Sequence, residues 1–320
     1  MIDGAPDARA APTVDLIAVI LAVTDEQPRV LTVRVPAAER PDVHRDALPA
    51  GPLDPAHDRT LELALRRWVR EQTGLELGYV EQLYTFGDRD RGGDDDGATA
   101  RALSIGYLAL VREEQPPASA ARWRPWYEHF PWEDWRRGRP SVLEAAIEPA
   151  LDAWLARCDA GQRERADIAF GLRGAAWDAY RVLDRYELLY EAGLVAESQR
   201  DDASASDPHR VGRAMAADHR RILATAIGRV RGKLKYRPVI FELVPPTFTL
   251  LQLQRVVEAL SGGALHKQNF RRLIERGGLV EGTGVRATTR GGRPPELFRF
   301  RREVLRERPT PGVTLPSIRR

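Results

Sequence analysis

Residues 249–278, TLLQLQRVVEALSGGALHKQNFRRLIERGG, predict the architecture of the C-terminal region. The first half carries apolar residues at helical spacing, and Thr249 and Gln252 stand in the positions of an N-terminal capping box. The glycine turn at 261–263 then leads into a second amphipathic stretch. Two short helices joined by a tight turn form a helix-turn-helix, which is the structure that this segment predicts.

The second of these predicted helices combines an apolar face with a polar one. Phe270, Leu273 and Ile274 are expected to face the core. The polar residues are of types that meet DNA, because Asn and Gln pair with adenine while Arg and Lys pair with guanine or phosphate. The candidates for these contacts are Lys267, Gln268, Asn269, Arg271 and Arg272.

Residues 279–300, LVEGTGVRATTRGGRPPELFRF, predict two short strands around a basic, glycine-rich loop, which is a wing. Such a loop can reach a phosphate backbone or the minor groove. We expect double-stranded DNA rather than RNA, because the stacking aromatics and clamping loop of the usual RNA modules are missing. A three-helix subdomain without a nucleic-acid role is the alternative. The candidate phosphate contacts are Lys233, Lys235, Arg237, Arg290 and Arg293.

The charge distribution separates this region from the rest of the chain. Residues 209–320 hold 24 Lys and Arg against 8 Asp and Glu, whereas the first 208 residues hold 25 against 38. The net charge of +3 for all 320 residues hides this asymmetry. An acidic body with a basic tail is typical of a polyanion-binding C-terminal module, although a solvated basic surface would have the same totals.

The front of the chain predicts an α/β domain. Two apolar blocks at 16–23 and 30–35 flank TDEQPR and predict a β-hairpin in a buried sheet. A helix is predicted over 60–73, with Gly74 ending it in the left-handed conformation. Two further strands are predicted at YVEQLYTF and LSIGYLALV, and this order of elements is typical of an α/β sandwich.

The middle of the chain differs from both ends. A linker-like stretch begins at Glu113, and residues 123–135 then place four of the seven Trp residues within 13 positions. So dense an aromatic cluster predicts a small core or a surface on which domains dock. Residues 141–197 predict helices, and a basic helix from about 213 to 234 is expected to join the body to the tail.

The segment LPAGPLDPAHDRTLELALRRWVREQTGLEL (48–77) resembles the Nudix box, G-x(5)-E-x(7)-R-E-U-x-E-E-x-G-U. Arg67 corresponds to the box arginine and Glu71 to the first of the paired glutamates. Trp68 and Gln72 stand where two other metal-binding glutamates of the family belong, and the upstream glutamate position falls on Arg59.

These exchanges bear on catalysis, because cleavage of a diphosphate needs Mg²⁺ ions held by carboxylate oxygens. An indole supplies no oxygen ligand, and the Gln72 amide offers only a neutral carbonyl. We therefore expect no catalytic residues, no metal site and at most weak hydrolysis. Two alternatives stay open: a divergent hydrolase in which Glu71, Glu62 and loop aspartates rebuild a metal site, and an ordinary amphipathic helix on which Arg67 and Glu71 form a surface pair.

A Nudix-like front with a winged-helix tail resembles the Nudix-related transcriptional regulators of NAD metabolism, the NrtR family. The resemblance is strongest from RILATAIGRV at 221–230 through GGRPPELFRF, and Asp218 and His219 also fit the family pattern. It implies an α/β Nudix-like sandwich and a C-terminal winged helix-turn-helix, here with a helical middle insertion. It further implies a non-enzymatic repressor that acts as a homodimer and binds ADP-ribose or a related NAD-derived nucleotide.

On this basis we divide the chain into residues 1–113, a Nudix-like effector-binding domain; 114–207, the insertion; and 208–320, a linker helix plus the winged helix. The candidate nucleotide contacts are Arg67, Glu71, Arg89 and Arg101. No cofactor is expected beyond this effector. A constitutive DNA-binding protein, whose front domain only holds a dimer together, is a further alternative.

The remaining sequence features are consistent with a cytoplasmic protein. The longest apolar run has eight residues, far below the roughly 20 of a membrane span. No secretory signal is visible, and the single Cys158 excludes an intramolecular disulfide. The six His residues are widely scattered without metal-ligand spacing, so we interpret all of them as ordinary.

Overall fold

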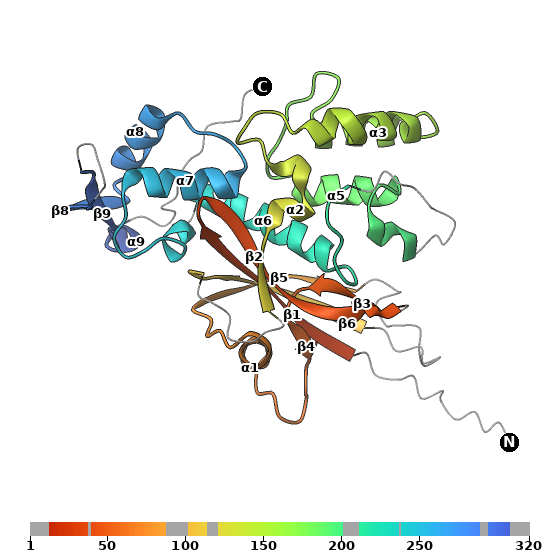
Figure 1. Cartoon of the computed structure of the whole chain (residues 1–320), viewed down its shortest axis with the longest axis horizontal. Helices are drawn as coiled ribbons and strands as arrows, with labels where there is room; N and C mark the ends of the chain where they lie inside the picture. Colours follow the sequence, from red (N-terminus) through yellow and green to blue (C-terminus); the bar gives the residue numbers. More distant parts are fainter. Residues whose placement is uncertain are drawn as a thin grey trace.

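The computed structural model describes residues 13–37, 40–87, 102–113, 121–200, 211–236, 238–288 and 294–307. It shows a mixed sheet, a mainly helical middle region and a C-terminal winged helix (Figure 1). The predicted fold class is therefore confirmed. None of the described helices has the length and apolar character needed to cross a membrane.

The sheet is built around a long antiparallel hairpin. Its main strand order is β3-β2-β1-β6-β5, with β4 paired to β1 and β7 paired to β2. Asp25 and Glu26 join β1 to β2 with φ of 50° and 61°, as a two-residue hairpin turn of type I′ requires. The strands are β1 (Thr13–Thr24), β2 (Gln27–Ala37), β3 (Arg40–Ala47), β4 (Ala50–Pro52), β5 (Tyr79–Phe86), β6 (Ala102–Leu110) and β7 (Ala121–Pro125).

Two helices cover opposite faces of this sheet. Alternate residues of β1 point to opposite sides, so Leu16, Ala18 and Ile20 pack with α1 (Leu61–Thr73). Ile17, Val19 and Leu21 belong to the core that contains α6 (His219–Tyr236). The predicted linker helix is thus also the second layer of the sandwich, which explains why β1 is apolar on both faces.

Two predictions differ from the structure in detail. The basic helix begins at His219 and not near Arg213, because the preceding residues are held in an irregular path that includes Ala217 at φ 46°. Strand β7 lies within the predicted insertion, yet its residues pair with β2 of the front sheet. The middle region therefore starts as part of the sheet.

The middle region packs around the aromatic segment. Trp126 and Trp132 are fully buried, as expected of a small aromatic core. Glu133 is buried between Arg185 and Arg231, each 2.5 Å away. Burial opposes ionisation of Glu133, but the two guanidinium charges hold its pKa below the ordinary value. The helices are α2 (Trp126–His129), η1 (Pro131–Glu133), η2 (Leu143–Ile147), α3 (Glu148–Leu155), α4 (Ala160–Phe170), α5 (Val182–Glu191) and η3 (Ala196–Arg200).

The C-terminal region has the predicted two helices and wing. The capping box of Thr249 and Gln252 is present, and Gly262 ends the first helix at φ 78°. A single buried core runs from the sheet through the middle region and α6 into the winged helix. The elements are η4 (Val239–Glu242), α7 (Leu250–Ser261), α8 (Lys267–Gly277), β8 (Val280–Arg286), β9 (Glu296–Phe300) and α9 (Val304–Glu307).

Candidate functional site

Helix α1 (Leu61–Thr73) ends where the sequence predicts and begins one residue later, because Thr60 is its N-cap. The Thr60 hydroxyl caps its start by accepting a hydrogen bond from the Leu63 backbone N–H, and Gly74 ends it at φ 74°. Ala64, Leu65 and Val69 are buried against the sheet. This orientation turns the Nudix-box positions 67, 68, 71 and 72 away from the centre of the core.

Trp68 and Gln72, which were predicted to stand at glutamate positions of the Nudix box, are both hydrogen-bonded to β4. The Gln72 amide accepts from the Ala50 backbone N–H at 3.1 Å and donates to the Ala50 carbonyl at 2.6 Å. Trp68 donates its indole N–H to the Pro52 carbonyl at 2.9 Å. Its ring also covers Gly51, where an added Cβ would lie 2.2 Å from ring atoms. Both side chains thus fasten α1 to residues 50–52.

Arg67 and Glu71 lie on the more exposed part of the helix. Arg67 donates three hydrogen bonds to Asp58, at 3.4, 3.1 and 3.0 Å, and lies 3.7 Å from Glu71. Bonds from the Asp54 backbone N–H and from Arg67 lower the pKa of Asp58. Half of the Glu71 side chain is exposed. Arg67 therefore has two carboxylate partners within the chain, of which Glu71 is the more exposed.

The other two predicted nucleotide contacts, Arg89 and Arg101, lie outside the described residues. Within the described ranges, no three His, Cys, Asp or Glu side chains are grouped so that they could hold a metal ion. The carboxylate of Glu62 is hydrogen-bonded by Arg66, at 2.9 and 2.8 Å. Arg66 also donates to the carbonyls of Leu77 and Gly78, which fixes the end of α1 against the next strand.

The polar face of α8 is exposed, in contrast. Lys267, Gln268, Asn269, Arg271 and Arg272 are all exposed, while Phe270 and Ile274 are buried beneath them. Within the part of the chain that the structure describes, the only hydrogen bond of these five side chains joins Arg272 to Asn269, at 3.1 Å. The structure thus brings the five candidate DNA contacts together on one helix face.

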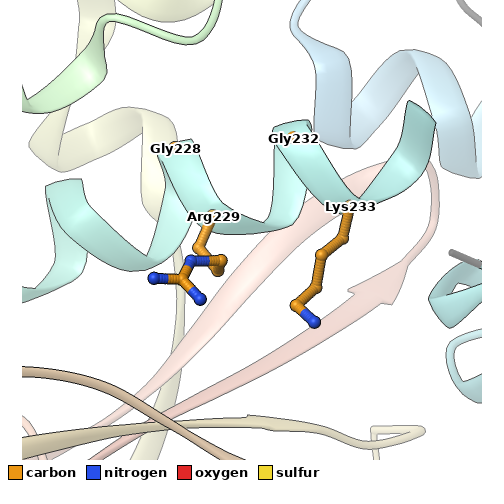
Figure 2. Close-up of a pocket in the computed structure, with 4 residues that line it drawn as sticks. All are labelled: Gly228, Arg229, Gly232 and Lys233. Carbon is orange, nitrogen blue, oxygen red and sulfur yellow. The ribbon is translucent and has the colours of Figure 1, made fainter. Parts of the chain in front are cut away.

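The predicted phosphate contacts outside α8 are more dispersed. Lys233 reaches back to the sheet, where its amine lies 2.5 Å from the Glu81 carboxylate, and Arg229 donates to the same group at 3.1 Å. The hollow that these side chains line has a volume of about 420 Å³ and is completed by Gly228 and Gly232. Figure 2 shows the Arg229 and Lys233 side chains extending away from α6. Lys235 is half-buried on α6. Arg237, Arg290 and Arg293 lie outside the described residues.

The winged helix is attached through the end of α7. Tyr127 donates its hydroxyl to the Ala259 carbonyl at 2.7 Å, and the Trp135 backbone N–H donates to Gly262 at 2.6 Å. Arg231 of α6 donates to the Leu260 carbonyl at 3.0 Å. The aromatic segment is therefore a docking surface as well as a core, as its composition predicted.

Sequence reasoning missed the role of His219, which it treated as ordinary. The Leu48 backbone N–H donates to His219 Nδ1 at 2.8 Å, so the first residue of α6 is bonded to the residue that starts the LPAG segment. The one available signal was the resemblance of Asp218 and His219 to a family pattern. That signal does not identify a backbone partner 171 residues away.

Comparison with known proteins agrees with this arrangement. Residues 240–300 match the family model of the NrtR DNA-binding winged helix domain. The ADPR responsive transcriptional repressor NtrR of Acinetobacter baylyi is 24% identical over 254 residues, covering 79% of this chain and 69% of that protein.

Two solved structures share the fold of nearly the whole chain. Shewanella oneidensis NrtR complexed with a 27mer DNA has a TM-score of 0.54 at 22% identity, covering 91% of this chain and 94% of that one. A MutT/nudix family protein from Enterococcus faecalis has a TM-score of 0.53 at 16% identity, covering 93% and 90%. These two structures confirm the fold, and the family model confirms the predicted resemblance to the NrtR winged helix over residues 240–300.

Proposed function

We propose that this chain, which joins a Nudix-type domain to an NrtR-type winged helix, is a ligand-responsive DNA-binding transcriptional repressor. The observation that carries the proposal is the exposed polar face of α8 in a domain that matches a DNA-binding model. An amphipathic second helix with exposed Asn, Gln, Arg and Lys side chains is suited to the major groove.

The effector that we propose is ADP-ribose or a related NAD-derived nucleotide. The A. baylyi relative is named as ADPR responsive, which supports the same ligand class for this chain. We propose Arg67, Glu71, Arg89 and Arg101 as the nucleotide contacts. To contact the phosphates, Arg67 would exchange its bonds with Asp58 for bonds to the ligand, because an arginine fork binds carboxylate and phosphate in the same way.

The Nudix-type domain would bind its ligand without hydrolysing it. Trp68 and Gln72 replace two metal-binding carboxylates of the Nudix box, and the hydrogen bonds of both side chains are made with the protein's own backbone. Their loss removes oxygen ligands for the Mg²⁺ ions that neutralise the transition state of diphosphate cleavage.

The repressor would act as a homodimer. Two winged helices related by a two-fold axis read DNA half-sites about one helical turn apart. A small rotation of one winged helix relative to the other would therefore weaken simultaneous binding to the two half-sites. We propose Lys267, Gln268, Asn269, Arg271 and Arg272 as base-edge and phosphate contacts. Lys235, Arg237, Arg290 and Arg293 would meet phosphates, and Lys233 would do so only if it left Glu81.

The test is gel-shift binding to DNA upstream of the protein's own gene and of neighbouring NAD-metabolism genes, with and without ADP-ribose, at a stated salt concentration. We expect specific binding that the nucleotide changes. Absence of specific binding at every salt concentration would overturn the proposal. Magnesium-dependent turnover of ADP-ribose that Glu71→Gln abolishes would instead support a hydrolase.

A further inference from the structure

Residues Asp46–Pro52 form a segment, here called the crossing segment, that contacts helices on both faces of the sheet. It contains the end of β3, the turn and β4, and Leu48 within it is 1% exposed. Its second half is bonded to α1, and its first half to the start of α6. It therefore connects the Nudix-box helix to the helix that leads into the winged helix.

The contacts with α1 involve the backbone of the crossing segment. Gln72 pairs with both backbone groups of Ala50, and Trp68 bonds to Pro52 while its ring lies on Gly51. A displacement of α1 along or about its axis must therefore break these bonds or move residues 50–52 with it. Because these bonds are directional, small displacements favour joint movement.

The contacts with α6 also involve the backbone of the crossing segment. Leu48 donates its N–H to His219 at 2.8 Å, and the Asp46 carbonyl accepts from the Ala216 N–H at 2.8 Å. The Asp46 carboxylate, 3% exposed, is 2.5 Å from Arg213. Three residues of the segment 213–219 are thus bonded to the first half of the crossing segment.

Helix α6 then extends this connection to the DNA-binding helices. Twelve residues after His219, Arg231 donates to the Leu260 carbonyl of α7 and lies against the buried Glu133. Ile227 and Val230 of α6 belong to the same core as Phe270 and Ile274 of α8. Helix α6 therefore contacts both the crossing segment at its start and the elements of the winged helix further along.

We propose that Gln72 and His219 are positioning residues that couple the Nudix-type domain to the winged helix through the crossing segment. This inference rests on the proposed function. A nucleotide bound beside α1 would shift Ala50 through Gln72, and Leu48 would shift α6 through His219. The bond to His219 Nδ1 requires an unprotonated acceptor at that atom, so the identity of this side chain matters.

The test compares two substitutions of His219 in the full-length protein. His219→Leu removes the acceptor, whereas His219→Asn keeps an acceptor oxygen near the Nδ1 position. His44→Leu is the matched control, because His44 is exposed on the same strand that ends in the crossing segment. For each protein, the DNA dissociation constant is measured with and without saturating ADP-ribose, together with the nucleotide dissociation constant and the melting temperature.

We expect ADP-ribose to change the DNA affinity of the unmodified chain by roughly 5- to 150-fold. In H219L this effect should fall to about twofold or less, while nucleotide affinity at the α1 site stays within about threefold. H219N and H44L should keep most of the effect. An unchanged nucleotide effect in H219L would overturn the inference.

This result is distinguishable from failure of the proposed function. If the unmodified chain binds DNA without responding to the nucleotide, the proposed function fails. If it responds and H219L responds equally, only the role of the crossing segment fails.

Arg213→Met provides a second variant in case H219L does not fold, because the Arg213 side chain is partly exposed and Arg124, 3.4 Å from the buried Asp46 carboxylate, still pairs with it. We expect a reduced nucleotide effect in this variant too. Hydrogen exchange gives an independent measurement on the unmodified chain. The Leu48 and Ala50 amides should change protection when ADP-ribose binds, and unchanged exchange at both would contradict the inference.

Discussion

Helices α1 and α8 are both amphipathic and polar on their outer faces, but their polar side chains are engaged very differently. On α1, Arg66, Arg67, Trp68 and Gln72 each bond to other parts of the chain. Among the polar side chains of α8, the described residues show only the hydrogen bond between Asn269 and Arg272. Side chains already satisfied within the chain add stability, whereas exposed and unsatisfied ones are available to an external partner.

This difference shows what Trp68 and Gln72 do at the two positions predicted to correspond to glutamates of the Nudix box. Both side chains hold α1 to the crossing segment. Helix α1 is therefore fixed in position relative to its neighbouring elements. Among the described residues, the outer face of helix α8 has no comparable contacts with the rest of the chain, and it carries the candidate DNA contacts.

The largest effect should come from removing the cations of α8. The double substitution Arg271→Ala and Arg272→Ala should weaken specific DNA binding by about 2–6 kcal/mol, because each arginine that meets a base or phosphate contributes about 1–3 kcal/mol. Fluorescence anisotropy over a salt series should also show a flatter salt dependence.

The matched control is Arg70→Ala on α1, which removes an exposed arginine from the other helix. The DNA affinity of this control variant should equal that of the unmodified chain. The melting temperature of the α8 double variant should also be unchanged, because both side chains are exposed. Equal losses of DNA affinity from the α1 and α8 substitutions would contradict the assignment of the DNA contacts to α8.

A smaller effect should follow from crowding α1 against the crossing segment. Gly51→Ala places a Cβ about 2.2 Å from the Trp68 ring, so we expect a loss of about 1–3 kcal/mol in the free energy of unfolding. Urea unfolding measures it. Combining G51A with Trp68→Ala should cost less than the sum of the single substitutions, and strict additivity would contradict the contact.

Gln72→Glu restores the box carboxylate, and we expect it to destabilise the fold by about 1–2 kcal/mol without producing hydrolysis. An ionised carboxylate cannot donate to the Ala50 carbonyl, 2.6 Å from the present amide. A protonated carboxyl can, so its folded pKa should rise and the stability deficit relative to the unmodified chain should shrink as pH falls. Unfolding measured from pH 7 to pH 4 tests this; a deficit that grows at low pH would contradict it.

The smallest effect concerns divalent cations. Because Trp68 and Gln72 supply no carboxylate, exchanging Mg²⁺ for EDTA should change the ADP-ribose dissociation constant by about twofold or less. Titration calorimetry in the two buffers measures it, with Glu71→Gln as the companion variant. Loss of nucleotide binding in EDTA would show that the remaining carboxylates still recruit a metal ion.

Elements with their own local signals could be predicted from the sequence. Thr60 and Gly74 mark the ends of α1, and the pair Thr249 and Gln252 marks the start of α7. These signals act within a few residues, through caps and turns, so they need no tertiary partner. The apolar face of α8 was predicted for the same reason, since its spacing places Phe270 and Ile274 on one side.

Strands β3, β4 and β7 could not be predicted in this way. Their sequences, RPDVHRDA, AGP and ARWRP, have little apolar alternation, and each is a strand because β1 or β2 pairs with it. The ion-pair partner of Lys233 was likewise decided by tertiary packing. It was predicted to meet phosphate, but Glu81 of β5 is its partner in the structure, and only the packing of α6 on the sheet brings the two together.

The sequence by itself determined the helix-turn-helix with its wing, the position of α1, and the residue types on the outer faces of α1 and α8. Each of these is a matter of residue type and local spacing. Only the tertiary structure decided that Trp68 and Gln72 hold residues 50–52, that His219 holds Leu48, and that α6 belongs to the sheet's core. Those contacts join backbone groups to residues far along the chain, and backbone groups are the same in every sequence, so residue identity alone does not reveal them.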